Sequence, residues 1–107
     1  MIARIWHGYT DKSNANAYET LLKNEIFTGI AKKNIVGYKG IQLLRRELEN
    51  EVEFITIMWF DTLQAIKDFA GTDYETAVVL PQARALLKRF DAKSQHYEIA
   101  HGMFVTV

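Results

Sequence analysis

The hydrophobic pattern is strongest between residues 51 and 60 (EVEFITIMWF), where β-branched and aromatic residues occupy both alternating faces. This pattern predicts a strand that must be covered on both faces. A helix predicted directly after it can cover one face, because its apolar residues share one side: Leu63, Ile66, Phe69 and Ala70. A second layer has to cover the other face.

Capping signals set the expected limits of that helix. Asp61 is expected to cap its first turn, with Gln64 three residues later as in a capping box. Gly71 is expected to end it. Thr72 with Glu75 repeats the capping pattern, which predicts a second short helix directly afterwards.

The first half of the chain predicts two further strands and one helix. Alternation predicts a strand over residues 2–9 and another over residues 41–47, and residues 48–51 (LENE) are polar enough for a hairpin turn. A helix begins after Asn16 or, alternatively, Asn14. Its apolar stripe consists of Tyr18, Leu21, Leu22 and Ile26.

The last third predicts one helix and one strand. Pro81 suits the first turn of a helix whose buried stripe is expected to be Ala83, Leu86, Leu87 and Phe90. Residues 96–101 (HYEIAH) follow as a strand, and residues 102–107 extend that strand or form a tail.

The predicted order of strand, helix, strand, strand, helix, strand indicates an α+β, ferredoxin-like βαββαβ fold. Its four-stranded antiparallel sheet would carry both helices on one face. The other face would then expose a large apolar patch, and a two-fold dimer with the sheets packed face to face would cover it. At 107 residues we expect a single domain over residues 1–107.

Composition excludes several classes of function. Lys plus Arg equals Asp plus Glu at 13 each, so no strong field draws the chain to nucleic acid or to an anionic membrane. The absence of cysteine excludes thiolate catalysis and fits a cytoplasmic protein, and no signal peptide or membrane span is predicted. No Ser-His-Asp order, phosphate-binding loop or dinucleotide motif is present.

Four segments resemble the antibiotic biosynthesis monooxygenase family of dimeric α/β barrels: ARIWHGYT, IVGYKGIQLLRR, FITIMWFDTLQAIKDFAG and the closing HYE. The resemblance spans roughly residues 2–100. It implies a homodimer whose sheets close into a barrel, with a pocket in each subunit between sheet and helices. It also implies oxidation of small or polycyclic aromatic substrates by molecular oxygen without metal, flavin or other cofactor.

The resemblance includes a haem-degrading branch, which uses an Asn on the first strand, a Trp on the second helix and a haem-ligating His after it. Here Trp6 or His7 aligns with that Asn, and Phe69 aligns with the Trp. Val78 or Val79 aligns with the His. Because valine cannot bind iron, we expect no haem degradation by that route.

The three histidines do not predict a metal site. His96 and His101 point to opposite faces of one strand, so they cannot chelate together. His7 and His96 could be neighbours, because the first and last strands pair in this topology. A polar position at a strand edge or pocket rim is the competing interpretation for both.

Arg4 and Trp6 share one face of the first strand, and His7 lies on the other. A cation beside an aromatic ring suits an anionic or phenolate-like planar ligand. The alternative is that Arg4 pairs with Glu53 or Glu98 while Trp6 fills the core.

The expected function is a cofactor-independent monooxygenase with His7 as base and Arg4 as anion stabiliser. The candidate substrate-binding residues are Trp6, Trp59, Phe69, Tyr74 and His96, with Trp59 and Phe69 as pocket walls. The alternative is a dimeric ligand-binding or stress-related protein without turnover, and a third option is a subunit of a larger assembly. Parity allows only Arg4 with Trp6, or His7, to face the helices.

Overall fold

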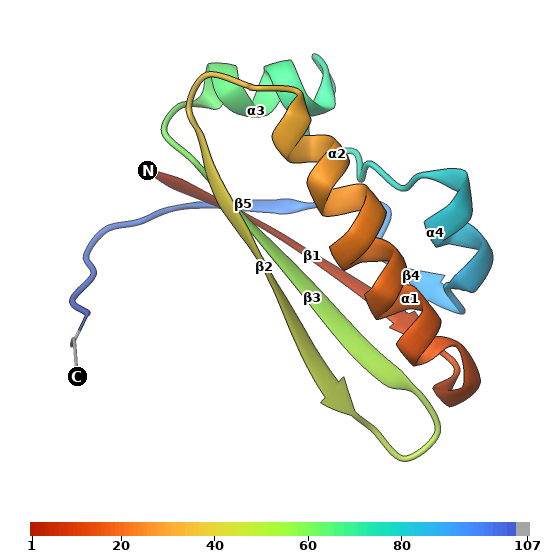
Figure 1. The fold of residues 1–107 in the computed structure, drawn as a ribbon. Coiled ribbons are helices and arrows are strands. Elements are labelled where there is room, and N and C mark those ends of the chain that lie inside the picture. Colours follow the sequence, from red (N-terminus) through yellow and green to blue (C-terminus); the bar gives the residue numbers. More distant parts are fainter. Residues whose placement is uncertain (105–107) are drawn as a thin grey trace.

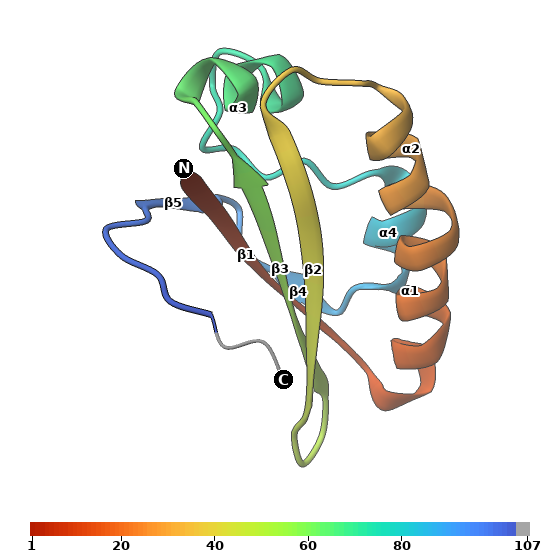
Figure 2. The ribbon, with the colours of Figure 1, turned by 60° about the vertical axis from the view of Figure 1, so that its left-hand side comes forward.

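The computed structural model describes residues 1–104 and consists of an antiparallel sheet with helices on one face (Figures 1 and 2). Strand β1 (Ile2–Thr10) lies inside the sheet and pairs along its whole length with β3 (Val52–Phe60). The β2 strand (Tyr38–Glu47) pairs with the other side of β3 and forms the outer edge. The predicted hairpin at residues 48–51 is confirmed by the pairing of Glu47 with Val52.

The free edge of β1 is covered by two short strands rather than one. Both β4 (Arg89–Phe90) and β5 (Gln95–Glu98) run antiparallel to β1, so together they fill the fourth position of the sheet. The order β2-β3-β1-β4, with β5 also on β1, confirms the ferredoxin-like α+β fold. Asp91 still donates to the His7 carbonyl of β1, and residues 92–94 then pair with residues 75–77.

One long helical rod crosses the sheet. It runs from α1 (Ala15–Leu21) through a π-helical turn (Leu22–Ile26) into α2 (Phe27–Lys32), preceded by a 3₁₀ turn at Lys12–Asn14. Figure 2 shows this rod and α4 (Pro81–Leu86) on the same side of the sheet, with α3 (Leu63–Ala70) at one end. No helix within residues 1–104 is long and apolar enough to cross a membrane.

Even-numbered side chains of β3 form the core beneath the helices. Phe54 packs against Tyr18 with ring centroids 4.9 Å apart, and both rings are buried. At the other end of the strand, Phe60 packs against Phe69 and lies in the same buried cluster as Ile66. Burial of side chains this large contributes on the order of 2 kcal/mol each, which fixes the register of β3 under the rod.

The cap of α3 differs from the prediction by one residue. Thr62 is the N-cap, and its Oγ1 accepts a hydrogen bond from the Ala65 N–H at 3.1 Å. Asp61 instead forms an ion pair with Lys39. The predicted helix end at Gly71 is confirmed, because this residue has φ +92°, a value that favours glycine.

Three predicted elements after α3 were wrong. No helix forms at residues 72–75, where the Thr76 hydroxyl bonds Asp73 within a turn. Helix α4 ends at Leu86, so Phe90 lies in β4 rather than on a helical stripe. The last strand ends at Glu98 and does not reach residue 101. Residues 99–104 have no regular structure, and residues 105–107 of the predicted tail lie outside the described residues.

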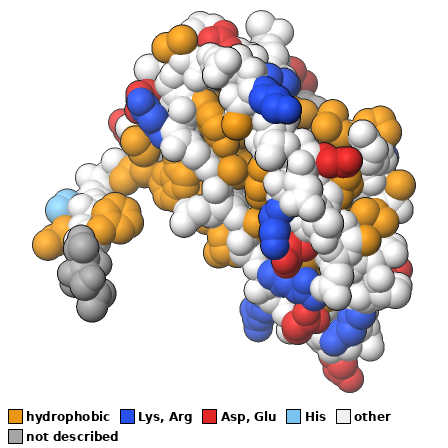
Figure 3. Space-filling model, in the orientation of Figure 1, with side chains coloured by type: hydrophobic (Ala, Val, Ile, Leu, Met, Phe, Trp, Pro, Cys, Tyr) orange, Lys and Arg blue, Asp and Glu red, His pale blue; other side chains and the backbone are white. Residues whose placement is uncertain are grey.

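The face of the sheet away from the helices is largely apolar. On this face, Ile5 of β1 pairs with Ile57 of β3. Ile55 of β3 has His7 of β1 on one side and Leu44 of β2 on the other. None of these side chains is fully buried. Figure 3 shows hydrophobic side chains gathered where the C-terminal segment leaves the sheet, and charges of both signs over the β2–β3 hairpin. An unpartnered apolar sheet face therefore remains on this chain.

Candidate functional site

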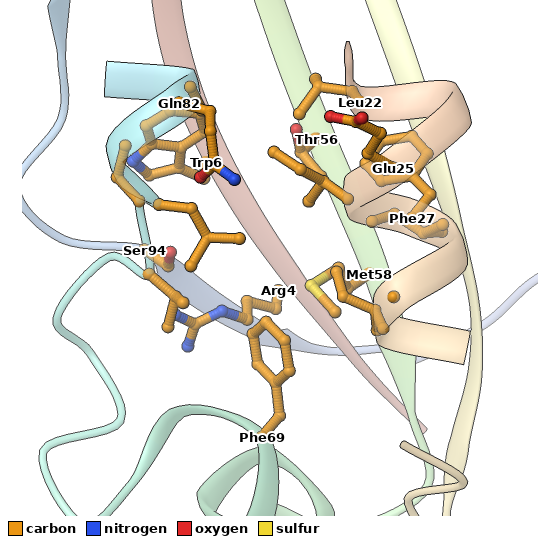
Figure 4. A pocket seen from close by; sticks show the side chains of 18 of the residues that line it. Arg4, Trp6, Leu22, Glu25, Phe27, Thr56, Met58, Phe69, Gln82 and Ser94 are labelled. Carbon is orange, nitrogen blue, oxygen red and sulfur yellow. The ribbon is translucent and has the colours of Figure 1, made fainter. Parts of the chain in front are cut away.

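A cavity of about 350 Å³ lies between the sheet and the helices (Figure 4). This volume is at the small end of the range for ligand pockets. Strands β1 and β3 form its floor, the helical rod forms one wall, and the segment from Val78 to Ala83 forms the opposite wall. Its walls are mainly apolar, and the polar or charged side chains that reach it include Arg4, Glu25, Lys33, Thr56, Gln82 and Ser94.

Arg4 is the most unusual residue of the cavity floor. Its side chain is only 3% exposed, yet no carboxylate among residues 1–104 forms an ion pair with it. Its Nη1 donates to the carbonyl oxygen of Tyr74, and Nη2 donates to that of Thr76 at 3.2 Å. Burial lowers the pKa of Arg4 to about 10, so it stays cationic at neutral pH. The floor of the cavity therefore carries an uncompensated positive charge.

His96 contacts this guanidinium but is not among the residues that line the cavity. Its Nε2 lies 2.9 Å from Nη1 of Arg4. Because arginine only donates, Nε2 must accept, and the imidazole is neutral with its proton on Nδ1. Burial lowers the pKa of His96, the charge of Arg4 lowers it further, and Glu75 opposes the shift. The Tyr74 ring meets the imidazole edge-on at 5.3 Å.

Two cationic side chains lie near the ring of Phe69 from α3. The guanidinium carbon of Arg4 and the Nζ of Lys33 each lie 5.6 Å from the ring centroid. Glu25 and Gln82 lie at the other end of the cavity, as Figure 4 shows. The cavity thus has a cationic aromatic end and an acidic end.

The position of Trp6 depends on the glycine two residues later in β1. The indole lies over Gly8, where an added Cβ would be 2.8 Å from Cη2 of the ring. The indole Nε1 donates to the Asp91 carbonyl at 2.7 Å, and the ring packs against Phe90. The interruption between β4 and β5 supplies this carbonyl, so the split edge strand orients one wall of the cavity.

The π-helical turn faces the cavity. Leu22, Glu25 and Ile26 all belong to this turn and all reach the cavity. Single π turns within α-helices occur often at functional sites. Further along the rod, Ile30 and Lys33 line the same wall.

The structure brings together Arg4, Trp6 and Phe69 of the predicted site residues, and all three line the cavity. Tyr74 and His96 contact Arg4 from behind rather than lining the cavity. The predicted neighbourhood of His7 and His96 does not form, because the two side chains lie on opposite faces.

His7 and Trp59 require correction, since both point away from the cavity. The Nδ1 of His7 lies 3.2 Å from a Glu53 carboxylate oxygen, and Trp59 donates to the side chain of Gln42 on the same open face. The physical reason is parity, because Met58 faces the helices and its neighbour Trp59 cannot. The alternative in which Arg4 pairs with Glu53 or Glu98 is not found within residues 1–104, and Glu53 instead bonds His7 and Tyr9.

Several cavity residues had not been singled out as site candidates: Glu25, Thr56, Met58, Gln82 and Ser94. Thr56 and Met58 share the parity of buried Phe54, and Thr56 is the polar exception on that face. A polar residue among apolar ones on a buried face can indicate a pocket, and this pattern is visible in the sequence. Ser94 had no such signal, because its place depends on the detour between β4 and β5. No cluster of three metal-ligating side chains occurs within residues 1–104.

The fold is similar to a crystal structure from Bacillus cereus named as a "putative antibiotic biosynthesis monooxygenase", with a TM-score of 0.68. The two chains are 12% identical, and the match covers 99% of this chain and 97% of the other. No family model and no curated protein matches the sequence. At this identity the likeness shows the fold alone.

Proposed function

We propose that the protein binds a small, readily deprotonated aromatic compound in the cavity and oxidises it with molecular oxygen. The observation that carries the proposal is the buried Arg4, which lacks a carboxylate partner within the described chain and reaches an otherwise apolar cavity. Burying such a charge without compensation costs several kcal/mol. A bound anion would offset that cost. The similarity in fold to the Bacillus cereus protein supports the choice of reaction.

Arg4 would act as the anion stabiliser. A cation within about 4–6 Å lowers the pKa of an acidic group by roughly 1–3 units, so a phenol with an ordinary pKa near 10 would be partly ionised. The electron-rich phenolate ring reacts with oxygen at the carbon opposite the hydroxyl. One oxygen atom enters the ring and the other leaves as water, which converts the phenol to a quinone. The base that sequence reasoning assigned to His7 has no part here, because His7 faces away.

The test combines binding with oxygen uptake. We expect 1-naphthol to bind at micromolar to millimolar concentration and to be consumed together with one equivalent of oxygen in the presence of a metal chelator. Arg4→Ala should abolish the uptake, because the phenolate loses its counter-charge. Arg84→Ala is the matched control, since Arg84 is exposed on α4 and does not line the cavity.

Binding without oxygen uptake would instead identify a ligand-binding protein of the same fold, the alternative raised by the sequence. Absence of any Arg4-dependent binding would contradict both interpretations.

We also infer that the open face of the sheet covers the same face of a second copy. Ile5, Ile55 and Ile57 form its centre, and Glu53 and Arg46 lie on the same face toward the hairpin end. Light scattering at micromolar concentration should show a dimer and no folded monomer. Ile57→Asp should unfold the chain, because the stability of an obligate dimer depends on association. The exposed helix variant Thr20→Asp should remain dimeric, and a stable wild-type monomer would contradict the inference.

A further inference from the structure

Two N–H donors of the Arg4 guanidinium have no hydrogen-bond partner within the described residues. It carries five N–H groups in one plane. Both protons of Nη1 are engaged, by the Tyr74 carbonyl and by His96 Nε2, and one proton of Nη2 is engaged by the Thr76 carbonyl. Within residues 1–104, Nε–H and the second Nη2 proton have no partner.

Nε–H lies on the edge of the guanidinium that it shares with Nη2, opposite Nη1. The Nη1 side is held by Tyr74 and His96, so the free edge points away from both. It is also reachable. Within the described part of the chain, one buried side-chain polar atom lacks both a hydrogen-bond partner and accessible surface, and that atom is Oγ1 of Thr10. Nε of Arg4 also lacks a partner, so it must keep some accessible surface. Arg4 lines the cavity, which is where that surface can be reached.

We propose that this edge binds a carboxylate, so that the cavity takes planar aromatic carboxylic acids. Two parallel N–H groups match the two oxygens of a carboxylate, whereas a phenolate offers one. The proposal rests on the cavity assigned above as the substrate site, and it narrows the substrate class from acidic aromatics in general to those that carry a carboxyl group.

The rest of the cavity orients such a ligand. Its carboxylate would lie at the end where Arg4 and Lys33 are close to Phe69, and its ring would lie among apolar side chains such as Met58 and Ile30. Glu25 at the other end repels a carboxylate, so one orientation is favoured. His96 acts as a positioning residue, because its lone pair holds Nη1 and keeps the free edge turned to the cavity.

Calorimetric titration of the intact wild-type protein tests the proposal without any substitution. We expect 2-naphthoate to bind at least tenfold more tightly than 2-naphthamide, which has the same shape and no charge. Acetate alone should bind more than a hundredfold more weakly than 2-naphthoate, because it lacks the ring. Equal affinity for 2-naphthoate and 2-naphthamide would overturn the proposal.

Variants then test the geometry. Arg4→Lys keeps the charge and removes the planar edge, so it should weaken 2-naphthoate binding at least tenfold while changing 2-naphthamide binding less than threefold. Arg84→Lys is the control and should change neither. Circular dichroism and the 2-naphthamide titration establish that Arg4→Lys is folded. If folded Arg4→Lys binds 2-naphthoate like the wild type, the bidentate site is wrong.

The outcome is separable from that of the proposed oxidation. Tight, Arg4-dependent binding of 2-naphthoate without oxygen uptake on any naphthol would leave the carboxylate site standing and remove the oxidation. Oxygen uptake on 1-naphthol with no preference for 2-naphthoate over 2-naphthamide would do the reverse.

Discussion

Replacing Gly8 by alanine should disturb both stability and the cavity wall. The new Cβ would lie 2.8 Å from Cη2 and 3.0 Å from Cζ3 of Trp6, and 3.1 Å from a methyl carbon of Leu87. Carbon atoms prefer about 3.5–4.0 Å, so the indole must move by roughly 0.7 Å. Leu87 and the Nε1 bond to Asp91 restrict other directions, which leaves movement toward the cavity.

The magnitude follows from two opposed effects. Overpacking of this kind costs about 1–3 kcal/mol. Alanine in a strand recovers roughly 0.5–1 kcal/mol over glycine through lower unfolded-state entropy. Overpacking wins, and Gly8→Ala should lower the free energy of unfolding by about 1–2 kcal/mol in urea titrations followed by circular dichroism. It should also weaken binding of 2-naphthoate, because the displaced indole enters the cavity.

A double-mutant cycle isolates the cause. In a Trp6→Phe background the two clashing ring carbons are absent, so Gly8→Ala should cost at least about 1 kcal/mol less there. Gly29→Ala is the matched control, because its Cβ would meet no atom within 4 Å and should instead stabilise the helix by about 1 kcal/mol. An equal cost of Gly8→Ala in both backgrounds would refute the contact with Trp6 as its origin.

Three further predictions concern other parts of the molecule. Thr10→Val should raise the free energy of unfolding by about 1 kcal/mol, because Oγ1 of Thr10 is enclosed without a partner in the described chain, and Thr10→Ser should not. The pKa of His96 in the folded state lies below its ordinary 6.5, so on acidification the unfolded chain binds the proton first. The free energy of unfolding, measured by urea titration, should therefore fall as the pH drops through 6.5. It should fall less in His96→Gln. Hemin should form no saturable complex with an axial histidine spectrum, because Val78 and Val79 line the cavity and no histidine of residues 1–104 does. A one-per-subunit complex that is lost on substituting His96 would contradict this.

Sequence reasoning predicted the fold well because local signals agreed with one another. The strand over residues 51–60, the hairpin before it and the Pro81 start of α4 each appear in the structure. The split of the last strand was not predictable from alternation. It depends on residues 92–94 pairing with residues 75–77, a contact between segments that carry no periodic signal.

The candidate site was predicted in part for a definite physical reason. Parity correctly separated Arg4 and Trp6 from His7, since a strand alternates strictly. It could not say which set faces the helices, because both faces of β1 and β3 are apolar enough to be buried. The choice is made by neighbouring residues such as Phe54 and Met58, whose larger apolar side chains lie under the rod. Trp59, next to Met58 in β3, therefore points to the open face and cannot form a wall of the cavity.

The split edge strand has a consequence for how the chain reaches its folded state. The bonds that hold Arg4 join residues 70, 72 and 92 positions apart in the chain. Loop closure of this length is slow compared with formation of the β2–β3 hairpin. On a ribosome, β1 would therefore emerge and pair with β3 while its other edge waits for β5 to be synthesised. During that interval the edge of β1 is an unpaired template, and slow translation near residue 95 should raise the fraction of chains that aggregate.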